Sequence, residues 1–449
     1  MNMVPQIGIE ICIRVVASLL FLNGIADAQV TNETPDVLYA DTLTISSLLS
    51  QVLERNDRLA ASRLMIESAR EKSSASGAWT DPMLMVGIEN LPTSFDVNQD
   101  PMTMKTLGLS WELPYSGRRG FERKASFAEI DQAAADSAMK ELEVESASIM
   151  AFYQLYFRQT TLERLVRQHA LDDQLTASAH ARFSSNLAGQ DEVLALESEK
   201  WRHEAAIINY SQELIEATIQ INALRGNEDL SRPVVALLPD SLPVPTSPIA
   251  WLNQAEKHNP ELIRLQGQSE SLRLSAQANK RMSWPMIELR TEYGFRSGSD
   301  IGMGGDEMPR DDMVSFGANV SLPLFNGRSQ KKMAHSMVIM SQSVERELSQ
   351  RRRELYAELT ALFEKAIRIQ EQIHLYENRI LPASEDALRI GMSGYSSNRT
   401  PYSSVIQQAR AVQDNAISLE QLKLDLAMTL LQAGMRTGEI SISPNNTIE

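Results

Sequence analysis

Four short segments of the chain alternate between apolar residues on one side and small or polar residues on the other. Residues 105–113 (KTLGLSWEL) have this pattern, and residues 83–90 (MLMVGIEN), 286–295 (MIELRTEYGF) and 313–322 (MVSFGANVSL) repeat it. A period of two residues is that of a β-strand with one apolar face. Each segment has about the nine or ten residues that a tilted strand needs to cross a bilayer. The pattern therefore predicts four β-strands, each with one apolar face.

Most of the remaining chain has the spacing of apolar residues that is typical of α-helices. The two longest predicted helices, near residues 118–183 and 328–393, have roughly 65 residues each and would reach roughly 100 Å. From Leu355 to Ile390, apolar residues recur at alternating spacings of four and three, the heptad pattern of a coiled coil. Pro382 interrupts this seam and is expected to kink the helix. Further helices are predicted near residues 46–79, 191–225, 247–282 and 403–435.

The sequence is internally duplicated, because four landmarks occur twice in the same order. The pairs are QVLERNDRL and QAEKHNPEL, DPM and WPM, ELPYSGR and SLPLFNGR, and FSSN and YSSN. We therefore expect a first structural repeat over residues 29–240 and a second over 248–440. The remaining expected parts are a signal peptide (1–28), a proline-rich linker (241–247) and a C-terminal tail (441–449).

The N-terminal segment has the features of a secretory signal. An apolar run from Val15 to Ala26 follows Arg14, and Ala26-Asp27-Ala28 supplies a small-x-small cleavage site. The alternative is a buried N-terminal helix. The single cysteine, Cys12, lies in this segment, so the mature chain would form no disulfide. No later apolar stretch approaches the roughly 18 residues of a transmembrane helix, so strands would have to do any membrane crossing.

Four strands are too few to cross a membrane alone. Single-chain membrane barrels begin at about eight strands, and lipid does not tolerate open strand edges. The four strands therefore form either a small soluble sheet or part of a barrel shared by several chains. We expect the shared barrel, because the chain offers these strands no other core.

The chain resembles the TolC-type outer-membrane factor family of bacterial efflux and secretion systems. The resemblance rests on the signal peptide, the duplication, the order of helices and strands, and the LP…GR motif that follows the second strand of each half. The resemblance covers essentially the whole mature chain. It implies a mainly α fold with a small β part. Four transmembrane strands per chain would form a twelve-strand β-barrel in a homotrimer, continued by an α-helical barrel. The stretches DPMLMVGIENLP and MTMKTLGLSWELPYSGRR also look like the subgroup paired with heavy-metal cation efflux pumps.

The resemblance also implies a location and partners. The protein would sit in outer-membrane lipid, extend into the periplasm, and bind a periplasmic adaptor protein and an inner-membrane pump of the resistance-nodulation-division type. It would be a passive export conduit, with heavy-metal cations as the expected substrate. Two alternatives remain. The same architecture would serve drug efflux or type I protein secretion, or the chain would be a soluble periplasmic coiled-coil scaffold or adaptor.

The resemblance places the adaptor contacts in the two turns near residues 183–190 and 395–402. The segment RFSSNL resembles the family's Arg-x-x-x-Gly-Leu tip, with asparagine in place of glycine. Asparagine adopts the left-handed backbone conformation more readily than most residues, so the turn is expected to persist. The alternative is that these are solvated turn residues. The expected contact residues are Arg182, Asn186, Leu187, Asn398 and Arg399.

Some relatives close the tunnel with an aspartate ring after the second turn, where this chain has Ser404 and Gln407. Asp191 and Glu192 would supply an acidic gate by three-fold symmetry, or they are acids favoured by the dipole at a helix start. An excess of acid in the barrel would favour cations. The expected lumen residues are Glu89, Glu112, Glu288, Arg290 and Glu292.

Composition excludes several other classes of function. The net charge of −15 argues against nucleic-acid binding, which needs basic patches. The 20 methionines and 6 histidines lack the spacing of a metal site, so no metal and no cofactor are expected. The chain has no HExxH, GxSxG or Walker motif, so an enzyme is not expected.

Overall fold

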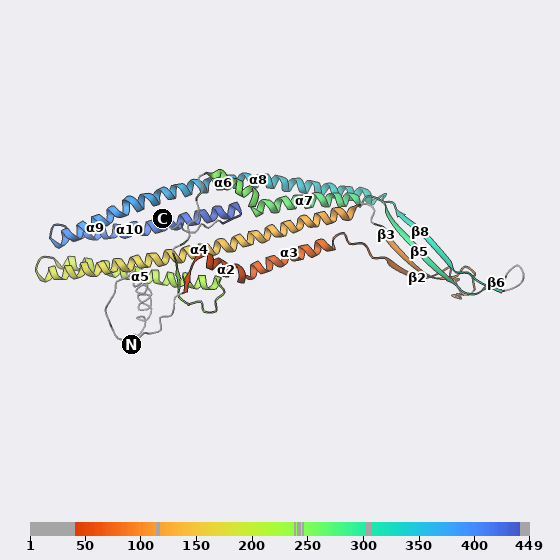
Figure 1. The fold of residues 1–449 in the computed structure, drawn as a ribbon, viewed down its shortest axis with the longest axis horizontal. Coiled ribbons are helices and arrows are strands. Elements are labelled where there is room, and N and C mark those ends of the chain that lie inside the picture. The colour runs from red at the N-terminus through yellow and green to blue at the C-terminus, as the bar shows by residue number, and fades with distance from the viewer. Residues whose placement is uncertain are drawn as a thin grey trace, which may run out of the picture. The chain divides into compact units, whose positions relative to one another are not determined.

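The computed structural model describes residues 41–97, 99–113, 117–237, 239, 244, 247–301 and 307–440, and Figure 1 shows the path of the chain. The predicted signal peptide with Cys12, the predicted tail and most of the predicted linker lie outside these residues. The fold is mainly α-helical with a small β part, as the sequence predicts. The chain divides into two compact units, and each draws on both halves of the sequence. One contains residues up to 60, 139–259 and 353 onward, and the other contains 61–138 and 260–352.

The first unit is built around two helical hairpins. The helix α4 (Arg118–Ser184) turns into α5 (Gln190–Leu224), and α9 (Leu381–Ser396) turns into α10 (Tyr402–Thr437). Figure 1 shows the two helices of each hairpin side by side. One apolar cluster takes residues from all four helices and so packs the hairpins together: Leu175, Ala179, Val193, Leu196, Leu388, Tyr395, Val405 and Ala409.

A second core in this unit surrounds α2 (Ile45–Arg55). Thr44 caps this helix, because its hydroxyl accepts a hydrogen bond from the N–H of Ser47 at 3.2 Å. Two strands of three residues each, β1 (Asp41–Leu43) and β4 (Val234–Ala236), pair in parallel beside it. The sequence does not predict them, because three residues are too few to show alternation. The core residues include Leu48, Val52, Phe152, Leu155, Ile221 and Leu431.

The helix predicted over residues 46–79 is in fact two helices, α2 and α3 (Asp57–Ala75), which corrects the prediction. The break is at Asn56, whose backbone is extended at ψ 112°. Its side-chain oxygen accepts hydrogen bonds from the N–H groups of Arg58 at 3.0 Å and Leu59 at 3.2 Å. Asn56 therefore ends one helix and caps the next.

The helix predicted over residues 247–282 is divided at the matching place. The helix α6 (Pro248–His258) ends at Asn259, and α7 (Pro260–Arg281) follows. The proline after Asn259 disfavours helical backbone at the asparagine. The side-chain amide of Asn259 also donates to the carbonyl oxygen of Arg436 at 2.7 Å, which fixes the break to α10.

The long helix of the second half is also interrupted. The helix α8 (Asn326–Leu375) passes into one π-helical turn, Tyr376–Ile380, before α9 begins. This turn lies just before Pro382, where the sequence predicts a kink. Proline has no N–H group, and its ring crowds the carbonyl one turn earlier, so the wider π turn relieves the conflict.

The π turn shifts the heptad seam by one residue. Leu355 and Leu359 are buried as predicted, upstream of the turn. Downstream, Leu388 and Gly391 are buried, whereas Ile390 is 71% exposed. The prediction that the same seam resumes after Pro382 as far as Ile390 is therefore wrong, because a π turn adds one residue to the helical repeat.

The second unit contains an antiparallel sheet of four strands in the order β2-β3-β5-β8. Within the described residues, the outer edges of β2 and β8 have no strand partner. A short hairpin of β6 (Ser299–Ile301) and β7 (Glu307–Pro309) follows β5. The main strands are β2 (Met83–Glu89), β3 (Met104–Leu113), β5 (Met286–Arg296) and β8 (Met313–Ser321).

We expect Gly438→Ala to destabilise the first unit. Gly438 ends α10 with φ +88°, and an added Cβ would overlap the carbonyl oxygen of His258. The free energy of unfolding should fall by about 1–3 kcal/mol. The control is Gly120→Ala in α4, where no described atom lies within 4 Å of the added Cβ. It should be neutral or stabilising by about 0.5–1 kcal/mol in denaturant melts, and equal losses in both variants would contradict the prediction.

Candidate functional site

The sheet has one apolar face and one polar face, and the apolar face is the exposed one. On β3, Leu107 and Leu109 are each 44% exposed, whereas Thr106 is 7% and Ser110 2% exposed. The register carries this division across all four strands, since Val86, Leu107, Tyr293 and Val314 lie opposite one another in turn. A soluble sheet buries its apolar face, so this sheet is inside out for a protein in water.

The five expected lumen residues all lie on the polar face. Glu112 and Glu288 are directly opposite each other in the register of β3 and β5. Arg290 donates a hydrogen bond to Glu292, and its guanidinium lies 3.7 Å from the carboxylate of Glu89. These five residues are four carboxylates and one guanidinium. Arg296 at the end of β5 adds a second guanidinium to this face, and an excess of negative charge remains.

The two helical turns have the same backbone geometry. Asn186 and Asn398 both adopt the left-handed conformation with φ 59°, as the sequence predicts. The N–H of Leu187 donates to the carbonyl of Arg182 at 2.8 Å. In the second turn the N–H of Arg399 donates to the carbonyl of Gly394 at 2.7 Å. These bonds close each helix end.

Arg182 joins the two turns to each other. Its guanidinium donates to the backbone carbonyl of Tyr395 at 2.9 Å and to the side-chain oxygen of Asn398 at 2.7 Å. It also lies 4.6 Å from the centroid of the Tyr395 ring, a cation–π distance. Leu187, in contrast, is 61% exposed. Arg399 is also exposed, and its guanidinium donates to the hydroxyl of Ser397 at 3.0 Å.

Asp191 and Glu192 both lie in the first turn of α5, and their side chains differ in environment. Asp191 is exposed. Glu192 is buried and accepts a hydrogen bond from the hydroxyl of Tyr395, and Arg182 lies 3.6 Å from its carboxylate. Burial, and then the nearby Glu192 carboxylate, raise the pKa of the Tyr395 phenol.

A row of buried polar residues joins the helices behind the turns, and sequence reasoning missed it. His203 on α5 pairs with Asp172 on α4, and Glu199 on α5 pairs with Arg410 on α10. Hydrogen bonding to Arg410 lowers the pKa of Glu199. The signal was present, because Glu199 and His203 continue the helical spacing of the buried Val193 and Leu196.

In the part of the chain that the structure describes, none of the helices is both long and apolar enough to span a membrane. In the same ranges, no group of three or more histidine, cysteine, aspartate or glutamate side chains is placed to hold a metal ion.

No protein-family model matches the sequence, and no curated protein matches it. Solved structures do match the fold. The outer-membrane channel OprN has 17% sequence identity and a TM-score of 0.66, covering 92% of this chain and 98% of its own. CusC, whose structures concern folding and transmembrane channel formation, has 15% identity and a TM-score of 0.70. The match covers 91% of this chain and 95% of CusC. The outer membrane protein VceC from Vibrio cholerae has 14% identity and a TM-score of 0.69, covering 88% and 96%.

The chain has the fold of the TolC-type outer-membrane channels. This confirms the fold class that the sequence predicts. The paired turns and the polar face of the sheet are the two candidate sites in this fold.

We expect Arg182→Ala to loosen both turns, because it removes the charged donor that links them. The free energy of local opening at the turns should fall by about 1–3 kcal/mol. Hydrogen exchange of the amides of residues 395–400 should accelerate accordingly. Arg399→Ala is the matched control, since its guanidinium does not bridge the hairpins. Equal acceleration in both variants would show that Arg182 does not hold the turns together.

The pair of His203 and Asp172 predicts a pH dependence of stability. The bond to Asp172 raises the pKa of His203 above its ordinary value, and burial opposes this. Glu199 and the amide of Gln413 also favour the protonated ring. The stabilisation is therefore complete below about pH 6.5 and is lost as pH rises through the higher folded-state pKa. The melting-temperature difference between the native chain and His203→Gln should be largest near pH 6 and smaller at pH 9. A difference that grows with pH would refute the assignment.

Proposed function

We propose that this chain is the protomer of an outer-membrane channel, the passive export conduit of a tripartite efflux system between the periplasm and the outside. The supporting observation is the inside-out sheet, which exposes leucine, valine and phenylalanine and buries serine and threonine. Lipid is the solvent that suits such a face, and a water-filled pore suits the polar face. The likeness to solved outer-membrane channels over about nine-tenths of the chain supports the same proposal.

The assembly that we propose is a homotrimer. The open edges of β2 and β8 need partners in lipid, and three copies of four strands would close a twelve-strand barrel. The helix α5 also carries an exposed apolar stripe with a spacing of seven residues, which fits helices of a second copy. The stripe is formed by Leu194, Trp201, Ile208 and Ile215.

We propose that the paired turns are the contact for a periplasmic adaptor protein. Asn186, Leu187, Asn398 and Arg399 are exposed there, and Arg182 holds the two turns in one surface. The exposed Asp191 would repeat three times around a trimer as an acidic ring, with Glu192 packed behind it. Energy for transport would come from an inner-membrane pump of the resistance-nodulation-division type.

For the substrate we propose cations, heavy-metal cations in particular. The support is the excess of carboxylates on the polar face, where Glu112 and Glu288 adjoin. A charged lining of one sign favours ions of the other sign. Drug efflux or protein secretion through the same channel would show no dependence on these carboxylates.

The test compares Leu109→Lys on the apolar face with Ser315→Lys on the polar face. A lysine facing the bilayer centre costs about 2–4 kcal/mol, whereas a lysine in a water-filled pore costs little. We expect the first variant to lose membrane insertion and the second to form a heat-modifiable trimer in detergent. A native chain that stays a soluble monomer without detergent would overturn the channel and favour a periplasmic scaffold.

A further inference from the structure

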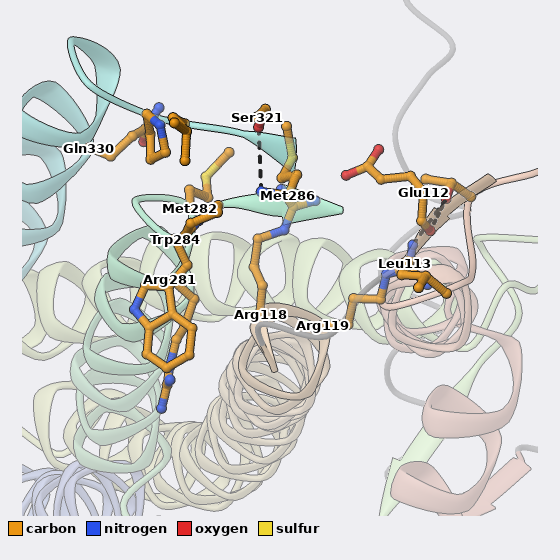
Figure 2. Close-up of a pocket in the computed structure, with 14 residues that line it drawn as sticks. Glu112, Leu113, Arg118, Arg119, Arg281, Met282, Trp284, Met286, Ser321 and Gln330 are labelled. Carbon is orange, nitrogen blue, oxygen red and sulfur yellow. Dashed lines mark hydrogen bonds between the residues drawn. The ribbon is translucent and has the colours of Figure 1, made fainter. Parts of the chain in front are cut away.

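A pocket of about 530 Å³ lies in the second unit, where the helices α4 and α7 meet the strands. Figure 2 shows the residues that line it, drawn from the ends of these helices and strands. Three arginines line the pocket, Arg118, Arg119 and Arg281, against one acidic residue, Glu112. The pocket is therefore positive in a chain whose net charge is −15.

The amino ends of α4 and α8, which lie near the pocket, are basic where helix physics favours acid. The amino end of a helix carries a partial positive charge, so aspartate and glutamate stabilise it and arginine does not. Neither α4 nor α8 has an acidic residue in its first turn. Together with the dipoles of α4 and α8, the basic residues near these two helix starts attract anions: Arg118, Arg119, Arg123, Lys124, Arg328, Lys331 and Lys332. Lys280 and Arg281 add positive charge from the last turn of α7, where the dipole favours it.

Two of the pocket arginines are not neutralised by the described part of the chain. Arg118 pairs with Glu122 at 3.0 Å, whereas neither Arg119 nor Arg281 has a carboxylate partner among the described residues. The Nη1 atom of Arg119 is buried and makes no hydrogen bond there. A buried charged donor without an acceptor is costly, so an anionic acceptor in the pocket would stabilise this group.

Tryptophans hold these arginines in place. The guanidinium of Arg281 lies 4.5 Å from the ring of Trp284, and Figure 2 shows the two side chains running together. The guanidinium of Arg119 lies 5.6 Å from the ring of Trp79, which stacks on Trp111 at 5.1 Å. Trp111 belongs to the apolar face, in line with Leu107 and Leu109. Tryptophan concentrates at the boundary between lipid and water, so the pocket lies at the edge of the apolar band.

We propose that this pocket binds the phosphate group of an anionic phospholipid at the membrane boundary. Arginine forks match phosphate oxygens with paired hydrogen bonds, and Arg119 supplies a buried donor that needs such an acceptor. The neighbouring tryptophans contact the upper part of the acyl chains. The inference rests on the proposed function, because it needs the apolar face to lie in lipid.

The test uses the full chain, purified as a trimer in detergent and studied by native mass spectrometry. Phosphatidylglycerol and phosphatidylcholine with the same acyl chains are added in turn. The native protein should retain phosphatidylglycerol preferentially. The double variant Arg119→Gln with Arg281→Gln should bind it about tenfold or more weakly. The control is Arg63→Gln with Arg70→Gln, two exposed arginines of α3 that remove the same charge and should change nothing.

Inorganic phosphate in large excess identifies the source of the ligand. Displacement of phosphatidylglycerol would support a phosphate site that soluble phosphates also fill, and retention would support recognition of the whole lipid. Equal lipid retention by the native protein and the double variant, or no preference between the two lipids, would overturn the inference. In that case the trimer would still form, whereas failure of the proposed function would appear as a monomer that needs no detergent.

Discussion

The exposed apolar face of the four-stranded sheet is the constraint on which the rest of the structure depends. Burial of apolar surface is the main favourable term in folding, and this sheet leaves that surface outside. Its small and polar residues pack beneath, with Gly108 close to Thr291 and the side chain of Met85. Such a sheet is stable only where the outside is itself apolar and where the open edges of β2 and β8 find partners. The membrane placement and the shared strands that we propose would meet this one requirement.

The helical hairpins are held together by a different balance of forces. Beside their apolar clusters, ion pairs link these helices, through Glu199 with Arg410, His203 with Asp172, and Arg164 with Glu420 at 2.8 Å. A buried ion pair adds little net stability, because desolvation offsets the attraction, yet removal of one partner is costly. Ion pairs of this kind specify which helix faces pack together and add little to the stability of the packing. This would suit hairpins that present a defined surface to the adaptor that we propose.

Two local features show how single residues adjust the long helices. Asn56 and Asn259 divide corresponding helices of the two halves, one by capping the next helix and one by bonding to α10. Pro382 acts over a longer range, because the π turn before it advances the buried seam by one residue. The basic helix ends around Arg119 break a local electrostatic rule in the same way. Departures of this kind are expected at functional positions, where another interaction compensates.

The sequence by itself determined the elements, because strand and helix periodicities are local properties of the chain. Strict alternation located the four strands and their faces, and the two asparagines fixed the left-handed turns that Asn186 and Asn398 adopt. Only the tertiary structure decided that β3 pairs with β5 from the other half, that Arg182 faces the other hairpin, and that Arg119 has no carboxylate partner among the described residues. These outcomes depend on contacts between residues far apart in sequence, and periodicity carries no information about them. The π turn depended on both sequence and tertiary structure. Pro382 predicts an interruption of the helix from the sequence, and packing decided that the interruption is a π turn.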